Sequence, residues 1–303
     1  MSERGSAVLA RLELPGARPI SPVESGAARA VAAVGSLDRG APRTGTPVVE
    51  VLSVEKFFPD GTRALAPIDL TVPAGEFVTL IGPSGCGKST LLKLIADLLE
   101  PSDGRILWWR GYGDKLGSDG RRIAFVFQDP TLMPWARVEA NVRLPLDLAG
   151  VTRQEARGRV ADALSRVGLQ GFERHYPRQL SGGMRMRVSI ARSLVTDPNL
   201  LLMDEPFGAL DEITRNRLDA DLLKLWWERK LTALFVTHSI YEAVFLSTRV
   251  VVISARPGRI FKTVTIDEPQ PRDEGFRDSP GFAAYCRQIS AWLAEASVPP
   301  GGA

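Results

Sequence analysis

Short apolar runs alternate along the chain with longer segments whose apolar residues recur at helical spacing. The strand-like segments are residues 48–58, 77–82, 104–109, 121–127, 199–204, 232–237 and 249–254. The helical patterns cover residues 88–99, 153–167, 182–196, 212–229, 239–247 and 281–296. Strands that alternate with helices pair in parallel, because each connecting helix packs on a face of the sheet. The pattern therefore predicts an α/β fold with a parallel central sheet.

Three further regions depart from this alternation. Residues 132–179 lack strand patterns, so we expect a helical subdomain over about 132–180, inserted into a domain that spans 47–266. Residues 1–46 are rich in Ala, Gly, Pro, Ser and Arg, a composition that buries too little apolar area to offset the entropy of ordering. We expect them to be a disordered N-terminal extension, and residues 267–303 to be a C-terminal helical tail.

Composition and charge exclude several classes of protein. The net charge of +3 gives no sign of a nucleic-acid footprint, despite a pI of about 9.0. Two cysteines, Cys86 and Cys286, are too few for a disulfide framework and suit a reducing cytosol. No apolar run approaches the roughly 20 residues that cross a bilayer, and the N-terminus lacks the apolar core of a secretory signal. We expect a cytosolic protein with no nucleic-acid partner.

The strongest chemical motif is the glycine-rich segment GPSGCGKST, which fits G-x-x-x-x-G-K-[ST] between a predicted strand and a predicted helix. Glycines let backbone N–H groups approach a phosphate, which the start of the helix also attracts. In this motif Lys88 reaches the β- and γ-phosphates of a nucleotide, and the Ser89 hydroxyl binds Mg²⁺. The predicted nucleotide-binding residues here are Gly82, Pro83, Ser84, Gly85, Cys86, Gly87, Lys88, Ser89 and Thr90.

Cys86 is expected to act only as a small residue of this loop. Its place beside Lys88 and a helix start is of the kind that can lower a thiol pKa and make the thiol sensitive to alkylation. A catalytic role for it is not expected.

A second signal is the acidic end of the apolar segment LLLMDEP. In a parallel sheet, the carboxyl ends of the strands face the ligand crevice. Asp204 is therefore predicted to hold Mg²⁺, directly or through water. Glu205 is predicted to be the general base that orients the attacking water on the γ-phosphate.

Together the motifs resemble the ATPase subunits of ABC transporters over residues 48–262. The matching segments, in order, are GPSGCGKST, FQD (127–129), LSGGM (180–184), LLLMDEP (200–206), GALD (208–211) and VTH (236–238). The resemblance implies a P-loop NTPase core with a parallel central sheet, an antiparallel β subdomain and an inserted α-helical subdomain. It also implies hydrolysis of ATP with Mg²⁺.

The second glycine pair belongs to the segment that resembles the ABC signature, Ser181, Gly182 and Gly183. A serine N-cap followed by bare glycine N–H groups makes another anion site. The resemblance implies that this site closes on ATP bound by a second subunit. We therefore expect an isologous homodimer that encloses two nucleotides.

The remaining functional positions follow from the resemblance one at a time. It implies that Gln128 senses Mg²⁺ and water, that Asp211 communicates across the dimer, and that His238 contacts the γ-phosphate. Gln128 could instead be a buried structural amide. Phe58 resembles the aromatic residue that stacks on adenine, with Phe57 as a competitor and a core position as the alternative.

Two departures from the common pattern remove no reactive group. Met184 stands where the signature commonly has Gln, and Ser239 where Asp commonly follows the histidine. The other histidine, His175, is expected to be structural.

The sequence of the segment PTLMPWARVEANVRLPL (130–146) is similar to that of importers of the nitrate, sulfonate, taurine and bicarbonate group. That similarity implies two transmembrane permease subunits, an indirect solute-binding protein, and a place at the cytoplasmic face of the inner membrane. A pyrimidine or thiamine precursor remains an alternative cargo. Trp135 is either an exposed docking residue or part of the subdomain core, and we expect one of Trp226 and Trp227 to be in the core.

Other classes of protein explain fewer of the motifs. A soluble ABC ATPase outside transport usually has two cassettes or a coiled-coil insertion, and neither pattern is visible. A nucleotide kinase would leave LSGGM and VTH unused, and a non-catalytic scaffold would be expected to lose Lys88, Glu205 or His238. The sequence LMPW is the main argument against identifying the chain as an exporter subunit.

Overall fold

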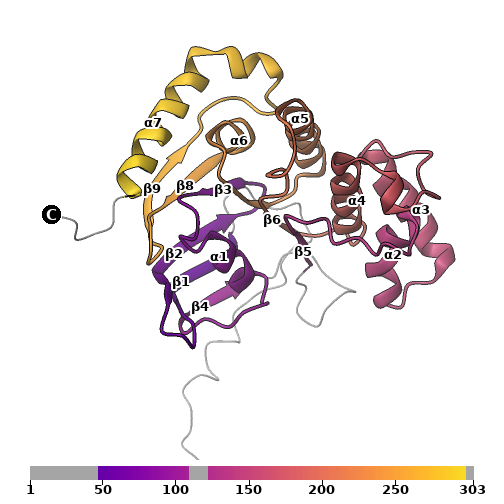
Figure 1. The fold of residues 1–303 in the computed structure, drawn as a ribbon, viewed down its shortest axis with the longest axis horizontal. Helices are drawn as coiled ribbons and strands as arrows, with labels where there is room; N and C mark the ends of the chain where they lie inside the picture. The colour runs from indigo at the N-terminus through magenta and orange to yellow at the C-terminus, as the bar shows by residue number, and fades with distance from the viewer. Residues whose placement is uncertain (1–46, 109–121, 298–303) are drawn as a thin grey trace, which may run out of the picture. The chain divides into compact units, whose positions relative to one another are not determined.

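A computed structural model describes residues 47–108 and 122–297 (Figure 1). The strands are β1 (Pro47–Phe57), β2 (Arg63–Pro73), β3 (Phe77–Ile81), β4 (Asp103–Trp108), β5 (Ile123–Val126), β6 (Leu200–Asp204), β7 (Ala233–Thr237), β8 (Arg249–Ile253) and β9 (Ile260–Thr265). The α-helices are α1 (Lys88–Ile95), α2 (Val138–Leu148), α3 (Arg153–Arg166), α4 (Gly182–Leu194), α5 (Glu212–Arg229), α6 (Ile240–Leu246) and α7 (Pro280–Ala296). Two short 3-10 helices are η2 (Pro177–Gln179) and η3 (Glu274–Asp278).

The larger sheet has the strand order β5-β6-β7-β3-β8-β9. Its neighbours pair in parallel except β8 and β9, which are antiparallel. Both faces are buried: Leu200 and Leu202 belong to one hydrophobic cluster, and Leu201 and Met203 belong to the other. Burial on both faces explains why the strands read as continuous apolar runs. The predicted α/β fold with a parallel central sheet is confirmed.

The smaller sheet is antiparallel, with the order β2-β1-β4. It confirms the antiparallel β subdomain that the family resemblance implied. We predicted no strand at β2 or β9. Two prolines interrupt the β2 sequence, and β9 is an edge strand with no buried residue, so its alternation is weak. The predicted strand ends at residues 109 and 121 lie outside the described residues.

The predicted helices agree with the structure to within two residues, apart from α1. That helix was predicted to run to residue 99 but ends at Ile95, because Asp97 adopts a left-handed backbone conformation with φ of 60°. Residues 132–180 contain α2, α3 and η2 and no strand, as predicted for the helical subdomain. α4 packs against α2 and α3 (Figure 1).

The C-terminal segment is part of the core. α7 packs against α6, β8 and β9 (Figure 1) and buries Phe282, Ile289 and Ala296 in the same hydrophobic cluster as the sheet. Trp226 is also buried there, whereas Trp227 is half exposed, so the expectation that one of this pair lies in the core is confirmed. Within the described ranges, no helix combines the length and apolar character needed to span a membrane.

Candidate functional site

The phosphate loop, residues 82–90, joins β3 to α1 as the motif predicted. Gly87 is the N-cap of α1 and has φ of 100°, a conformation that residues with a side chain rarely adopt. A methyl group on Gly87 would lie 2.5 Å from Leu65 Cδ2 and 2.9 Å from the Ala64 carbonyl oxygen. The glycine therefore lets the loop turn tightly against β2 and start the helix.

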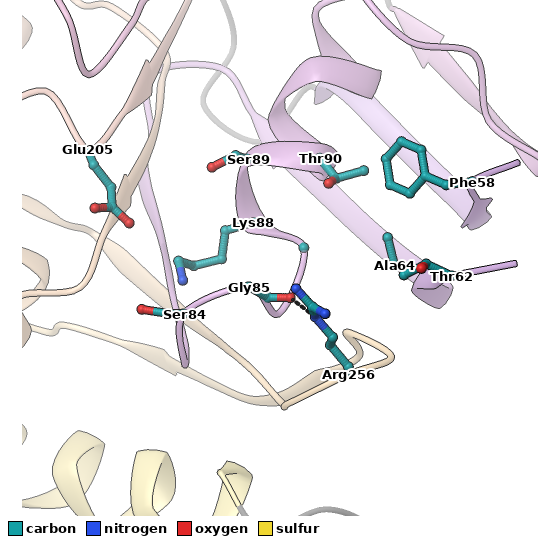
Figure 2. Close-up of a pocket in the computed structure, with 11 residues that line it drawn as sticks. Phe58, Thr62, Ala64, Ser84, Gly85, Lys88, Ser89, Thr90, Glu205 and Arg256 are labelled. Carbon is teal, nitrogen blue, oxygen red and sulfur yellow. Dashed lines mark hydrogen bonds between the residues drawn. The ribbon is translucent and has the colours of Figure 1, made fainter. Parts of the chain in front are cut away.

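A pocket of about 270 Å³ lies over this loop (Figure 2). Its lining residues come from the phosphate loop, the β1–β2 turn, the end of β6 and the β8–β9 turn. They are Phe58, Thr62, Ala64, Ser84, Gly85, Gly87, Lys88, Ser89, Thr90, Glu205 and Arg256. In Figure 2, Phe58 and Glu205 lie at opposite ends of the pocket with the loop between them. The pocket is therefore elongated, with an aromatic end and an acidic end.

Lys88 supplies a buried positive charge at the base of the loop. Its Nζ donates hydrogen bonds to the carbonyl oxygens of Gly82, at 2.8 Å, and Pro83, at 3.0 Å. Cys86 is also buried, with its Sγ 3.8 Å from Lys88 Nζ. The expectation of a lowered thiol pKa is wrong: burial raises the pKa of Cys86, and this outweighs the opposing charge of Lys88.

Ser89 and Asp204 meet at the acidic edge. The Ser89 hydroxyl donates to Asp204 Oδ1 at 2.7 Å. Burial raises the pKa of Asp204, the Ser89 hydrogen bond opposes this, and neighbouring Glu205 raises it further. In nucleotide sites Mg²⁺ usually takes one or two carboxylates together with phosphate oxygens, and this pair fits that donor set. Within the described ranges, no cluster of three or more acidic, His or Cys side chains could hold a metal without such phosphates.

Glu205 and His238 form a pair beyond Asp204. His238 Nδ1 lies 3.1 Å from Glu205 Oε2. Glu205 has φ of 45°, and its backbone N–H donates to the Val236 carbonyl at 2.9 Å. A left-handed conformation costs a residue with a side chain about 1–2 kcal/mol, and such strain tends to cluster at functional sites.

Gln128 approaches the same place. A methyl group on Gly208 would lie 3.5 Å from His238 Cε1 and 3.7 Å from Gln128 Nε2. Gln128, His238 and Glu205 are thus gathered around Gly208. Gln128 is exposed, so its interpretation as a buried structural amide is wrong.

The signature residues lie elsewhere. Ser181 is the N-cap of α4, and its hydroxyl accepts from the Met184 N–H at 3.2 Å, as its residue type predicted. Asp211 caps α5 in the same way, accepting from the Thr214 N–H at 2.9 Å, and this hydrogen bond lowers the pKa of Asp211. Neither these residues nor Gly182 and Gly183 line the pocket.

Phe57 and Phe58, the two candidates for the residue that stacks on adenine, lie in different surroundings. Phe58 lines the pocket, while the ring of Phe57 is outside it, 45% exposed, with the Arg63 guanidinium 5.2 Å from its centre. His175 packs on Phe172, with ring centres 5.0 Å apart, and does not line the pocket.

Sequence reasoning missed three lining residues, Thr62, Ala64 and Arg256. Arg256 lies in the turn between β8 and β9, and its Nε donates to the Gly85 carbonyl at 2.8 Å (Figure 2). Arg256 could be predicted only together with β9, because the pairing of β9 with β8 brings the turn between these strands onto the phosphate loop. The hydrogen bonds between Gly258 and the backbone of Ala64 and Ala66 fix this contact.

Comparison with known proteins identifies the family. The ABC transporter family model matches residues 65–208. An uncharacterized ABC transporter ATP-binding protein of Methanocaldococcus jannaschii is 48% identical over 242 residues, which are 80% of this chain and 88% of that protein. The aliphatic sulfonates import ATP-binding protein SsuB of Bacillus licheniformis is 46% identical over 238 residues, which are 78% of this chain and 90% of that protein.

A solved structure gives the same result. It is the dimeric ATP-binding cassette MJ0796 in a post-hydrolysis state bound to ADP and phosphate, with 32% identity and a TM-score of 0.62. The match covers 73% of this chain and 100% of that one. The pocket over a phosphate loop, the acidic strand end and these similarities agree: the chain belongs to the ABC transporter ATP-binding proteins and is an ATPase of that family.

Proposed function

We propose that this ATPase is the energy-supplying subunit of an ABC importer for a small solute of the nitrate, sulfonate or taurine type. The observation that carries the catalytic part is the arrangement of one pocket, with Phe58 and Glu205 at opposite ends and Lys88 and Ser89 between them (Figure 2). The similarity to a sulfonate importer subunit over 90% of that subunit's length supports the transport part.

In this proposal ATP lies along the pocket. Its base stacks on Phe58 and its phosphates lie on the N–H groups of residues 82–90, at the start of α1. Lys88 neutralises the β- and γ-phosphates. Ser89 and Asp204 hold Mg²⁺, with Gln128 near it. The ion supplies electrostatic stabilisation of phosphate charge when bound.

Glu205 acts as the general base toward water at the γ-phosphate, and His238 stabilises the charge that develops there. The 3.1 Å contact between these side chains supports a joint role, because each one orients the other. The Gln128 amide and the His238 ring both lie close to Gly208, which supports a place for Gln128 in the same group. Catalysis in this arrangement consists of positioning and electrostatic stabilisation.

A second copy completes the site. Ser181, Gly182 and Gly183 present an N-terminal helix end that the pocket of their own chain does not use. In the proposed homodimer these residues bind the γ-phosphate held by the partner, and Asp211 lies close to the contact. The dimeric state of the MJ0796 cassette supports this arrangement.

The membrane partners are proposed to dock near Trp135, which is 76% exposed and follows Gln128 along the chain. A large exposed aromatic side chain is typical of an interface anchor. The proposed complex contains two such ATPase subunits and two transmembrane permease subunits. A solute-binding protein acts on the permease, no nucleic acid takes part, and the ATPase lies at the cytoplasmic face of the inner membrane.

Co-purification from membranes tests the transport function. We expect the tagged chain to recover a multi-span membrane protein from gently extracted membranes. Trp135→Ala should reduce this recovery while ATPase activity persists. Trp227→Ala is the matched control, since Trp227 is also exposed but lies on α5. Recovery only from the cytosol, or with ribosomes or DNA-repair proteins, would overturn the transport proposal and leave the ATPase in place.

The proposed stacking of the base on Phe58 predicts that substitutions of Phe58 and of its neighbour Phe57 have different effects on the KM for ATP. Phe58→Ala should raise the KM for ATP by about tenfold, because stacking of a base on an aromatic ring contributes about 1–3 kcal/mol. Phe57→Ala should leave the KM unchanged, since that ring lies outside the pocket. Steady-state hydrolysis measured over a range of ATP concentrations distinguishes the two variants. Equal effects from both would remove Phe58 from the nucleotide site.

A further inference from the structure

Two buried carboxylates outside the pocket have no part in the chemistry described so far. Glu242 on α6 and Asp219 on α5 are 4% and 0% exposed. Burying a carboxylate is costly unless it is paired and hydrogen-bonded. Each of these carboxylates nevertheless leaves one oxygen without a hydrogen bond, Glu242 Oε1 and Asp219 Oδ1. Such a cluster needs an explanation beyond packing.

The first contact of Glu242 reaches the residues on either side of His238. The Thr237 hydroxyl donates to Glu242 Oε2 and accepts from the backbone N–H of Ser239 at 2.9 Å. The Glu242 N–H in turn donates to Ser239 Oγ at 3.3 Å. Since residues 237 and 239 are both held, Glu242 fixes the backbone turn from which the His238 side chain reaches Glu205.

The second contact of Glu242 leads toward Asp211. Arg215 Nε lies 3.8 Å from Glu242 Oε1, and Arg215 Nη2 donates to the Leu210 carbonyl at 2.7 Å. Leu210 directly precedes Asp211. One guanidinium therefore connects the turn that carries Asp211 with the carboxylate that holds the histidine turn.

The C-terminal segment closes this cluster from the other side. Arg277 in η3 donates to Asp219 Oδ2 at 2.9 Å, and its guanidinium lies 3.8 Å from the centre of the Phe245 ring on α6. Burial, together with the nearby charge of Glu242, raises the pKa of Asp219 to about 7, although Arg277 opposes this shift. Arg277 thus fixes α5 and α6 relative to each other around Glu242.

We propose that Glu242 is a positioning residue for His238, and that Arg215 makes this position depend on the turn that carries Asp211. The inference rests on the proposed role of His238 in hydrolysis. The signal passes from Asp211 at the dimer contact through Arg215, Glu242 and Thr237 to His238. A misplacement of a catalytic group by about 1 Å can cost about 100-fold in rate, so a small shift of this turn suffices to switch hydrolysis.

Thr237→Val tests the link because it keeps the shape of the side chain and removes only the hydroxyl. We expect kcat to fall about tenfold or more with the KM for ATP unchanged, since the nucleotide pocket does not include Thr237. Thr237→Ser keeps the hydroxyl and should retain the wild-type kcat. Glu242→Gln is the second variant if the valine protein fails to fold: it removes the charge that faces Arg215, and a fall in kcat at constant KM is again expected.

A double-mutant cycle with His238→Ala separates this inference from the function it rests on. If Glu242 acts through the histidine, Thr237→Val costs nothing further in the His238→Ala background. An equal loss in both backgrounds, or a wild-type kcat for both Thr237→Val and Glu242→Gln, overturns the positioning role alone. A wild-type kcat for His238→Ala overturns the proposed role of His238 and the inference together.

Discussion

Glu205→Gln lowers kcat by about 10²–10⁴-fold, which is the range that a general base contributes, while ATP still binds. Glutamine keeps the size of the side chain and can still contact His238 Nδ1, but it cannot accept a proton from water. Since Lys88, Ser89 and Asp204 are unchanged, ATP affinity is retained and the dimer remains closed around ATP that it cannot hydrolyse. Phosphate release measures the rate, and size-exclusion chromatography with and without ATP measures the dimer.

Glu228→Gln is the control for this variant. Glu228 is an exposed residue of α5 that pairs with Lys224 at 3.9 Å. Exposed pairs of this kind contribute little, so its loss should leave both kcat and dimerisation unchanged. Near-normal turnover by Glu205→Gln would end the assignment of Glu205 as the base.

Lys88→Met differs from Glu205→Gln, because it removes ATP binding as well as hydrolysis. Lys88 is 5% exposed and lies at the base of the loop, so solvent has little access to compensate for the loss of its charge. Its loss also leaves the carbonyl oxygens of Gly82 and Pro83 without their donor. We expect activity to fall by about 100-fold or more, in line with the loss of a main electrostatic group.

Fluorescent-nucleotide titration distinguishes this variant from Glu205→Gln, which binds ATP without hydrolysing it. Lys224→Met is the matched control, since the Lys224 side chain is 74% exposed on α5, and it should behave as wild type. If Lys88→Met bound ATP with unchanged affinity, the phosphates could not lie on this loop.

The sequence was informative wherever local pattern and local structure coincide. The segment that carries Lys88 and Ser89 was predicted because glycine spacing and a following helix are enough to build a phosphate loop. The sequence assigned Ser89 and Asp204 to Mg²⁺ separately, and the structure adds the direct hydrogen bond between these side chains, which are 115 positions apart.

What the sequence did not predict depends on long-range packing. Arg256 reaches the pocket only because β9 pairs with β8, and β9 has too little burial to give a clear pattern. The choice between Phe57 and Phe58 depended on which of the two adjacent rings lines the pocket, which local pattern does not decide. The pKa of Cys86 was misjudged because a neighbouring lysine is visible in the sequence, whereas the burial that outweighs it is not.

The contacts of α7 change what counts as the smallest unit of this protein that can fold. The matched family model ends at residue 208, and the motifs end at His238. The Ala296 carbonyl, however, accepts the backbone N–H of Ala255 at 2.8 Å, directly beside Arg256. A fragment bounded by its recognisable motifs would therefore lose both part of its apolar interior and the support behind one wall of its nucleotide site.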